Sequence, residues 1–173
     1  MNTLSFKHMP RLLVAALLTL CITPAVCRAS VEPELTMAVR QKNVMRVQLL
    51  LASGVNVNER DEGAEQTPLM RAVQVKDLSL VQILLAHGAA VNAQDDTGKT
   101  ALMFAVEKDD AEIVRLLLRK GADDAVRDAG AVTAADIARK HGHALVLRMV
   151  THSRTATAAK SGKQAGDRVI ALQ

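Results

Sequence analysis

Apolar residues in the middle of the chain follow the spacing of two consecutive helices. From residue 113 to residue 118 they recur at intervals of one, three and four, which places them on one face of a helix. The pattern predicts a short helix over 100–108 and a longer helix over 110–120 that is buried on most of one side. Gly121 follows at once, and a residue without a Cβ atom accepts the left-handed conformation in which many helices end. We therefore expect a helix–turn–helix unit of about 33 residues between residues 95 and 128.

Two independent landmarks repeat with this period along the chain. The glycines after the longer helical pattern and the threonines before the shorter one are Gly54, Gly88 and Gly121, and Thr67, Thr100 and Thr133. The glycines are 34 and 33 residues apart, and the threonines are 33 and 33 apart. One residue is therefore added in the first interval, and we expect it within residues 59–66. A repeated unit of this length indicates a stack of repeats, in which each unit buries its apolar face against its neighbours.

The repeated motifs resemble those of the ankyrin repeat. Residues 67–72, Thr-Pro-Leu-Met-Arg-Ala, match the family's Thr-Pro-Leu-His-x-Ala, and residues 83–89, Ile-Leu-Leu-Ala-His-Gly-Ala, match its helix-to-loop ending. The resemblance implies an all-α solenoid of four helix–turn–helix repeats, with β-turn or hairpin fingers between them. The expected repeats are residues 32–58, 59–92, 93–125 and 126–150, within a folded domain of residues 30–150.

The chain departs from the family pattern at the turn between the two helices of each repeat. The family's glycine is present there as Gly142, whereas Lys42, Lys76 and Asp109 occupy the equivalent positions. A residue with a Cβ atom in a left-handed turn costs on the order of 1 kcal/mol. We therefore expect this array to be less stable than one built from the family consensus.

The first repeat has no repeat before it, so it is expected to cap the array with a polar outer face. Arg40, Lys42 and Arg46 would supply that face. Leu35 and Val47 are expected to face the second repeat instead.

Residues 1–29 have the three-part build of a secretory signal peptide. Lys7 and Arg11 precede an apolar run over residues 12–22, and small residues lead to a cleavage site after Ala29. The apolar run is well short of the roughly 20 residues that span a bilayer. Lipidation of Cys27 is an alternative, although the preceding residues do not resemble a lipoprotein signal. The sequence therefore predicts a periplasmic or secreted protein with no membrane span after signal removal, and the resemblance by itself implies a small exported protein of bacterial type.

Charge divides the chain into three parts. Residues 1–29 carry three cations and no acid, residues 30–150 carry 15 Lys and Arg against 17 Asp and Glu, and residues 151–173 carry four cations against one acid. The folded array is nearly neutral, so the basic balance of the whole chain does not indicate nucleic-acid binding. Residues 151–173 are also rich in small and polar residues, and we expect a flexible basic C-terminal tail.

The sequence contains no motif for catalysis, for a cofactor or for a metal. No nucleophile elbow and no glycine-rich phosphate loop is present. His141 and His143 could suggest a metal pair, but they flank a turn glycine and lack a third ligand at helical spacing. The Asp pairs at 95–96, 109–110 and 123–124 lack the ligand pattern of a calcium loop, so helix caps and solvated loops are the expected roles. The chain is therefore not expected to be an enzyme.

The resemblance implies a protein-binding function, because ankyrin arrays bind proteins through finger tips and the concave face of the first helices. The matching positions are Arg60, Glu62, Gln66, Gln74, Val75, Asp96, Thr97, Lys99, Glu107, Lys108, Lys140 and His141. We expect a monomeric adaptor or modulator of another protein, such as a periplasmic enzyme. The alternative is a membrane-surface or anionic-ligand binding protein that uses the basic tail. Phe104 is the one aromatic residue beyond residue 29, so aromatic stacking is excluded as the main means of recognition.

Overall fold

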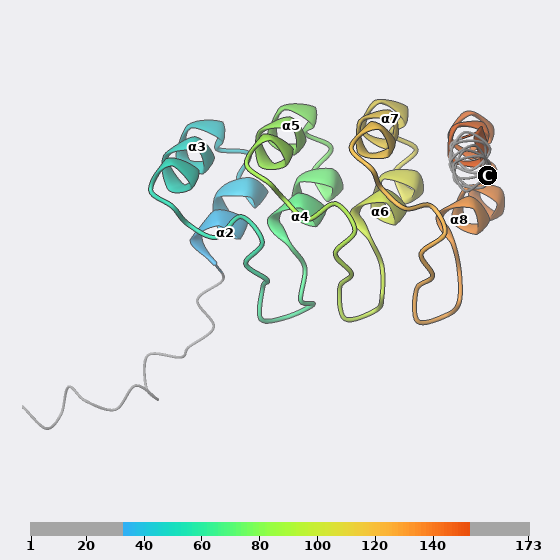
Figure 1. Cartoon of the computed structure of the whole chain (residues 1–173), viewed down its shortest axis with the longest axis horizontal. Helices are drawn as coiled ribbons and strands as arrows, with labels where there is room; N and C mark the ends of the chain where they lie inside the picture. Colours follow the sequence, from blue (N-terminus) through green and yellow to red (C-terminus); the bar gives the residue numbers. More distant parts are fainter. Residues whose placement is uncertain (1–32, 153–173) are drawn as a thin grey trace, which may run out of the picture. The chain divides into compact units, whose positions relative to one another are not determined.

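The computed structural model describes residues 33–152, which form pairs of helices joined by long loops (Figure 1). The helices are α2 (Glu34–Arg40), α3 (Val44–Ala52), α4 (Pro68–Gln74), α5 (Leu78–Ala86), α6 (Ala101–Glu107), α7 (Ala111–Arg119) and α8 (Ala134–His141). Residues 144–152 are also helical and complete a fourth pair with α8. The predicted signal peptide and the tail from residue 153 onward lie outside the described residues. Among the described residues, β pairing is limited to one isolated bridge, between Gln94 and Thr100.

The repeating threonines start the first helix of a repeat. The side chains of Thr67, Thr100 and Thr133 each accept a hydrogen bond from the backbone amide three residues later. Such a cap satisfies one of the amides that an α-helix leaves without a partner at its first turn. In the second helices Asp77 and Asp110 do the same for α5 and α7. The helix-cap role expected for the Asp109–Asp110 pair is therefore confirmed for Asp110.

The repeating glycines end the second helices. Gly54, Gly88 and Gly121 have φ angles of +85°, +84° and +86°. In each case the amide of the next residue returns to a carbonyl five residues earlier, as from Ala122 to Leu117 at 3.0 Å. This reversal turns the chain away from the helix and toward the next finger.

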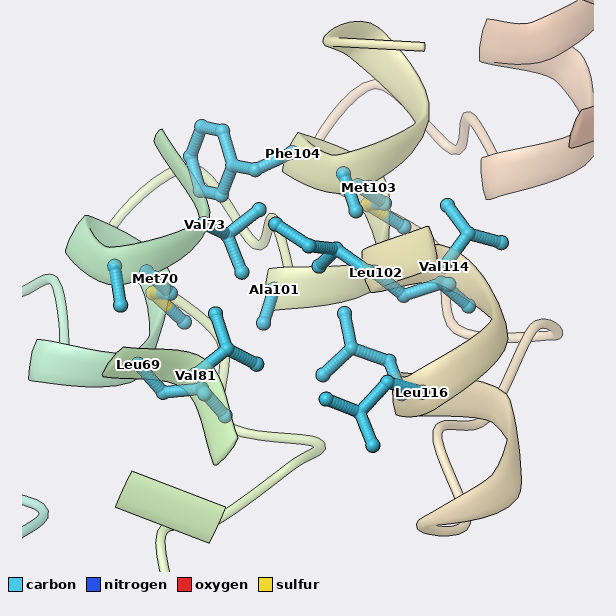
Figure 2. Close-up of a cluster of buried hydrophobic side chains, with 14 of the residues drawn as sticks. Leu69, Met70, Val73, Val81, Ala101, Leu102, Met103, Phe104, Val114 and Leu116 are labelled. Carbon is cyan, nitrogen blue, oxygen red and sulfur yellow. The ribbon is translucent and has the colours of Figure 1, made fainter. Parts of the chain in front are cut away.

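The repeats stack through their first helices. α2 packs against α4, α4 against α6, and α6 against α8, while α3, α5 and α7 form a second, outer row (Figure 1). Leu69 and Val73 of α4 lie in one apolar cluster with Leu102 and Phe104 of α6 (Figure 2). Burying one such side chain stabilises the fold by about 1.5–3 kcal/mol. The all-α repeat solenoid implied by the resemblance is confirmed.

An ion pair replaces apolar residues at the N-terminal end of the array. Arg46 lies at the position where the later repeats bury Leu80, Ile113 and Val146, each 0% exposed. Its guanidinium Nη2 is 2.6 Å from Oε1 of Glu34. The polar cap expected from Arg46 is therefore present.

The N-terminal cap is only partly polar. Leu49 is 69% exposed, whereas its counterpart Leu116 is 7% exposed because the preceding repeat covers it. Met37 and Met45 are also exposed on α2 and α3. The polar outer face expected for the first repeat thus also contains a small apolar area.

A second ion pair caps the C-terminal end. Arg139 occupies the position of Val39, Val73 and Val106, which are buried in the earlier repeats. Its Nη1 atom is 2.8 Å from Oδ1 of Asp136. The last described repeat thus carries a charged residue at the position where the three earlier repeats bury valine.

The turns between paired helices are left-handed, as predicted. Lys42, Lys76 and Asp109 each have a φ of +53°, and Gly142 has a φ of +73°. Three of the four turns therefore place a side chain in a backbone region that favours glycine.

Replacing Lys76 with glycine should stabilise the array by about 1 kcal/mol, because the left-handed strain at this residue is removed. The measurement is the urea midpoint of the variant against that of the parent. Lys108→Gly is the matched control, since Lys108 lies in the next interhelical turn with an ordinary φ of −85°. The control should lose stability, and a Lys76→Gly variant that loses as much would contradict the assignment of strain.

Candidate functional site

The loops between repeats form three fingers, each closed by a backbone hydrogen bond. The amide of an aspartate at the base bonds to a carbonyl across the finger at 3.0 Å in all three. The bonded residues are Asp61 with Gln66, Asp95 with Lys99, and Asp128 with Val132. The first finger is one residue longer between these points, so the insertion predicted within residues 59–66 is confirmed.

The base aspartates also shape the fingers with their side chains. Oδ1 of Asp95 accepts hydrogen bonds from the amides of Thr97 and Lys99 at 3.0 and 2.9 Å. Oδ1 of Asp128 accepts the equivalent pair of amides in the third finger. Asp95 is 7% exposed, so its expected role as a helix cap or solvated loop residue is wrong. The sequence could have shown this role, because Asp61, Asp95 and Asp128 recur with the repeat period.

Neighbouring fingers are bonded to each other. The amide of Asp96 donates to the carbonyl of Ala64 at 3.3 Å, and the amide of Ala129 donates to the carbonyl of Thr97 at 2.9 Å. A Cβ atom at Gly98 would lie 2.9 Å from the amide nitrogen of Ala129, so the close approach requires glycine there. The three fingers therefore form one continuous ledge beside the first helices.

A buried ion pair ties the first finger to α4. Asp61 is 4% exposed, and its Oδ2 accepts hydrogen bonds from Nε and Nη2 of Arg71 at 3.0 and 2.6 Å. Its Oδ1 accepts from the amides of Ala64 and Gln66 at 3.1 and 3.0 Å. Burial acts to raise the pKa of Asp61, but the bonds from Arg71 and these amides outweigh it and hold the pKa below its usual value.

Two of the predicted binding residues belong to this network. Nε2 of Gln74 donates to Oε1 of Gln66 at 2.8 Å, and Nε2 of Gln66 donates to Oδ2 of Asp95 at 3.2 Å. Arg71 reaches Gln74 through Nη1 at 3.2 Å. Gln66 is 8% exposed, so it joins two fingers from inside and supports the surface rather than lying on it.

A second ion pair ties the next finger to α6. Nζ of Lys99 lies 2.5 Å from Oε1 of Glu107, and both side chains are nearly three-quarters buried. The same ammonium lies 5.6 Å from the centre of the Phe104 ring. Lys99 and Glu107 were expected as separate partner-binding charges, and the structure brings them together as a pair.

The other predicted residues lie on the fingers and at the C-terminal ends of the first helices. Glu62, Asp96 and Thr97 are exposed on the fingers, as is Arg60, whose Nη1 donates to the carbonyl of Gln94 at 2.8 Å. Those at the helix ends are Val75, Lys108, Lys140 and His141, of which Val75 is half-buried. We call the fingers together with α2, α4, α6 and α8 the finger-side surface (Figure 1).

His143 has a structural role between repeats. Its Nδ1 lies 2.9 Å from the carbonyl oxygen of Val106 and 3.6 Å from Oδ1 of Asp109. His141 lies beside it, with ring centres 5.5 Å apart. Within residues 33–152 no group of three or more His, Cys, Asp and Glu side chains is arranged to hold a metal ion.

The Asp61 network makes the stability of the array depend on pH. Because the folded-state pKa of Asp61 is lowered, its ionised form stabilises the fold at pH values above the unfolded pKa of about 3.9. This contribution is lost as the pH falls through the folded-state pKa. The contribution should be largest at neutral pH.

Asp61→Asn should lower the free energy of unfolding by about 2–3 kcal/mol at pH 7, because the bond from Arg71 loses its ionised acceptor. Urea denaturation at pH 7 and at pH 3 would measure it, and the gap to the parent should narrow at the lower pH. Asp128→Asn is the control. Oδ1 of Asp128 accepts hydrogen bonds from two backbone amides of its own finger, as Oδ1 of Asp61 does, but Asp128 has no ion pair with an arginine within the described residues. A gap that stays constant between the two pH values would refute the assignment.

A family model of ankyrin repeats, in three copies, matches residues 35–128, which is more than half of the 173-residue chain. The matched range covers α2 apart from its first residue, α3 to α7 and the first two fingers. Comparison with curated protein sequences gives no match. On the family match and on the repeated helix pairs and fingers, this chain belongs to the ankyrin-repeat family.

Proposed function

We propose that this chain is a non-catalytic adaptor that binds a partner protein through its finger-side surface. Ankyrin repeats are generally protein–protein interaction modules, and their family is typically non-catalytic. The proposed adaptor acts as a monomer and uses neither a cofactor nor nucleic acid. None of the helices within residues 33–152 has the length and apolar character that a membrane crossing requires.

The observation that carries the proposal is that the finger-side surface is held in place before any partner binds. Hydrogen bonds join neighbouring fingers, and the Asp61–Arg71 and Lys99–Glu107 pairs join two fingers to the first helices. A preorganised surface loses little conformational entropy on binding, so more of its contact energy contributes to affinity.

The exposed charges of the finger-side surface are of both signs, which favours specific recognition of one partner more than high affinity. Glu62 and Asp96 are exposed acids on the fingers, whereas Lys108 and Lys140 are exposed cations at the helix ends. Opposite charges at separate edges favour one orientation of a partner over others, and they contribute less to overall affinity.

Partner capture should depend on the finger-side surface and not on the tail. A variant with Glu62, Asp96, Lys99 and Glu107 changed to alanine should bind the partner at least tenfold more weakly, since losing one desolvated charge contact costs about 2–5 kcal/mol. Lys99 and Glu107 are removed together so that neither is left unpaired. Affinity capture from an envelope fraction, with quantification of the retained partner, provides the measurement.

Two further chains serve as controls. One carries alanine at four exposed positions of the outer helices, Gln48, Gln82, Glu112 and Arg115, and should capture the partner as the parent does. The other ends at Thr151 and should also retain binding. If the folded finger-side variant still captures the partner while the truncated chain does not, the tail-centred alternative replaces this proposal.

We also propose that the chain works in the periplasm or outside the cell, on a partner of that compartment such as a periplasmic enzyme. The support is the basic start, apolar run and small residues of residues 1–29. Mass measurement of the protein from the exported fraction should give a chain that begins at Ser30. A chain that retains Met1, or one lipidated at Cys27, would refute this cleavage.

A further inference from the structure

The first repeat has an apolar area on its outer end, where the described part of the chain has no preceding repeat. Met45 is 78% exposed and Leu49 is 69% exposed, and they lie one turn apart on α3. Met37 of α2 is 41% exposed, whereas Phe104, its counterpart in the third repeat, is 8% exposed. We call Met37, Met45 and Leu49 the N-terminal apolar area.

The fold does not require an apolar side chain at the position of Met45. The equivalent residues of the second and third repeats, Ser79 and Glu112, are also exposed, and both are polar. Among residues 33–152 four large apolar side chains are exposed, and three of them form the N-terminal apolar area. The fourth, Leu145, lies in the last repeat. Exposed apolar side chains that gather in one place indicate a docking site more than single ones do.

One segment of the chain matches this area in chemistry. Residues 169–172 read Val-Ile-Ala-Leu and are the one run of four apolar residues beyond residue 152. They follow residues 153–168, which carry four cations and one acid. Counted from the last repeat, this segment therefore offers positive charge first and apolar side chains afterwards.

The finger tips offer the complementary charges in the same order. The tip of the third finger, beside the last repeat, is Ala-Gly-Ala and carries no charge. The second finger exposes Asp96, and the first exposes Glu62 together with Glu65, which pairs with Arg60. From the last repeat to the first, the tips thus become acidic and lead toward the N-terminal apolar area. A basic segment that ends in apolar residues fits this sequence of surfaces.

The length of the segment also matches the distance that it would cover. Packed helices lie about 8–10 Å apart, so the first and last repeats are about 24–30 Å apart. A chain of 16 residues, such as 153–168, reaches at most about 53–58 Å and averages about 20–24 Å when it is free. The apolar run can therefore reach the first repeat, and a tether of this length gives an effective concentration in the millimolar range. Even a weak apolar contact would be populated at that concentration.

We propose that residues 153–173 act as a strap that lies along the finger tips and docks residues 169–172 on the N-terminal apolar area. The strap covers Glu62 and Asp96, which belong to the finger-side surface. A partner protein has to displace the strap, so the strap lowers the affinity for every partner and excludes weak ones. The proposal rests on the proposed function, because it adds an autoinhibitory segment to the same surface.

Pairs of introduced cysteines test the strap in the exported full-length chain, without a partner. Cleavage after Ala29 removes Cys21 and Cys27, so the introduced thiols have no native competitor in the mature chain. One thiol comes from Gln173→Cys. The other replaces one exposed residue at an equivalent outer position of each repeat, which is Gln48, Gln82, Arg115 or Arg148. The disulfide yield in a glutathione buffer measures the effective concentration of each pair.

A free tail and a docked strap give opposite orders along this series. For a free tail the effective concentration falls steadily from Arg148→Cys to Gln48→Cys, because the first repeat is the farthest from residue 152. For a docked strap the Gln48→Cys pair should be the strongest, at least tenfold above the Gln82→Cys pair. Replacing Met45 and Leu49 with serine should remove this excess. Leu145→Ser is the matched control and should leave it unchanged.

Three results would overturn the strap. They are an effective concentration that falls toward Gln48→Cys, an equal loss of the excess in Leu145→Ser, and a Gln48→Cys disulfide that joins two chains instead of closing one. The third result would make a second copy the source of the docked segment.

Partner capture tests the inhibitory role of the strap. A chain that ends at Thr151 should capture the partner several-fold more tightly than the parent, and equal capture would reject inhibition. The disulfide series needs no partner, so its failure rejects the strap alone. The proposed function fails separately, if the finger-side alanine variant captures the partner as the parent does.

Discussion

The structure depends on the burial of one apolar stripe between each pair of neighbouring repeats. Leu35, Leu69 and Leu102 occupy the same place in successive repeats and are 0–1% exposed. No repeat can bury this stripe alone, so every repeat stabilises its neighbours and the ends of the stack must be closed differently. The two end ion pairs, Glu34–Arg46 and Asp136–Arg139, lie where the interior repeats bury apolar residues.

Polar networks then position the fingers on this apolar stack. A finger is a loop with few apolar side chains, so its shape comes from the base aspartates and from bonds to the next finger. The buried Asp61–Arg71 pair joins this loop structure to α4. Removing one partner of such a pair leaves an unsatisfied charge, which makes the finger geometry sensitive to single substitutions. Stability and the form of the finger-side surface are thereby linked.

The distribution of charge follows the same division between inside and outside. Arg71 and Lys99 pair with Asp61 and Glu107 and hold two fingers to the first helices, whereas Lys42, Lys76, Lys108 and Lys140 expose their side chains near the ends of those helices. Lys42 and Lys76 do so in strained turns. Glycine at these positions would relieve the left-handed strain, so the array carries a local cost to stability in these turns.

The sequence by itself determined the period, the helix boundaries, the inserted finger residue and the left-handed turns. These features depend on local chemistry: Thr67 caps its own helix, and Gly121 ends one, whatever lies beyond. Only the tertiary structure decided which polar and charged side chains are exposed to a partner and which are buried or paired within the array. Gln66 and Asp95 look like exposed loop residues in the sequence, yet they are buried against each other because two fingers meet across 29 positions. Lys99 and Glu107 likewise become a pair only when the finger folds back on α6, since pairing depends on distance in space.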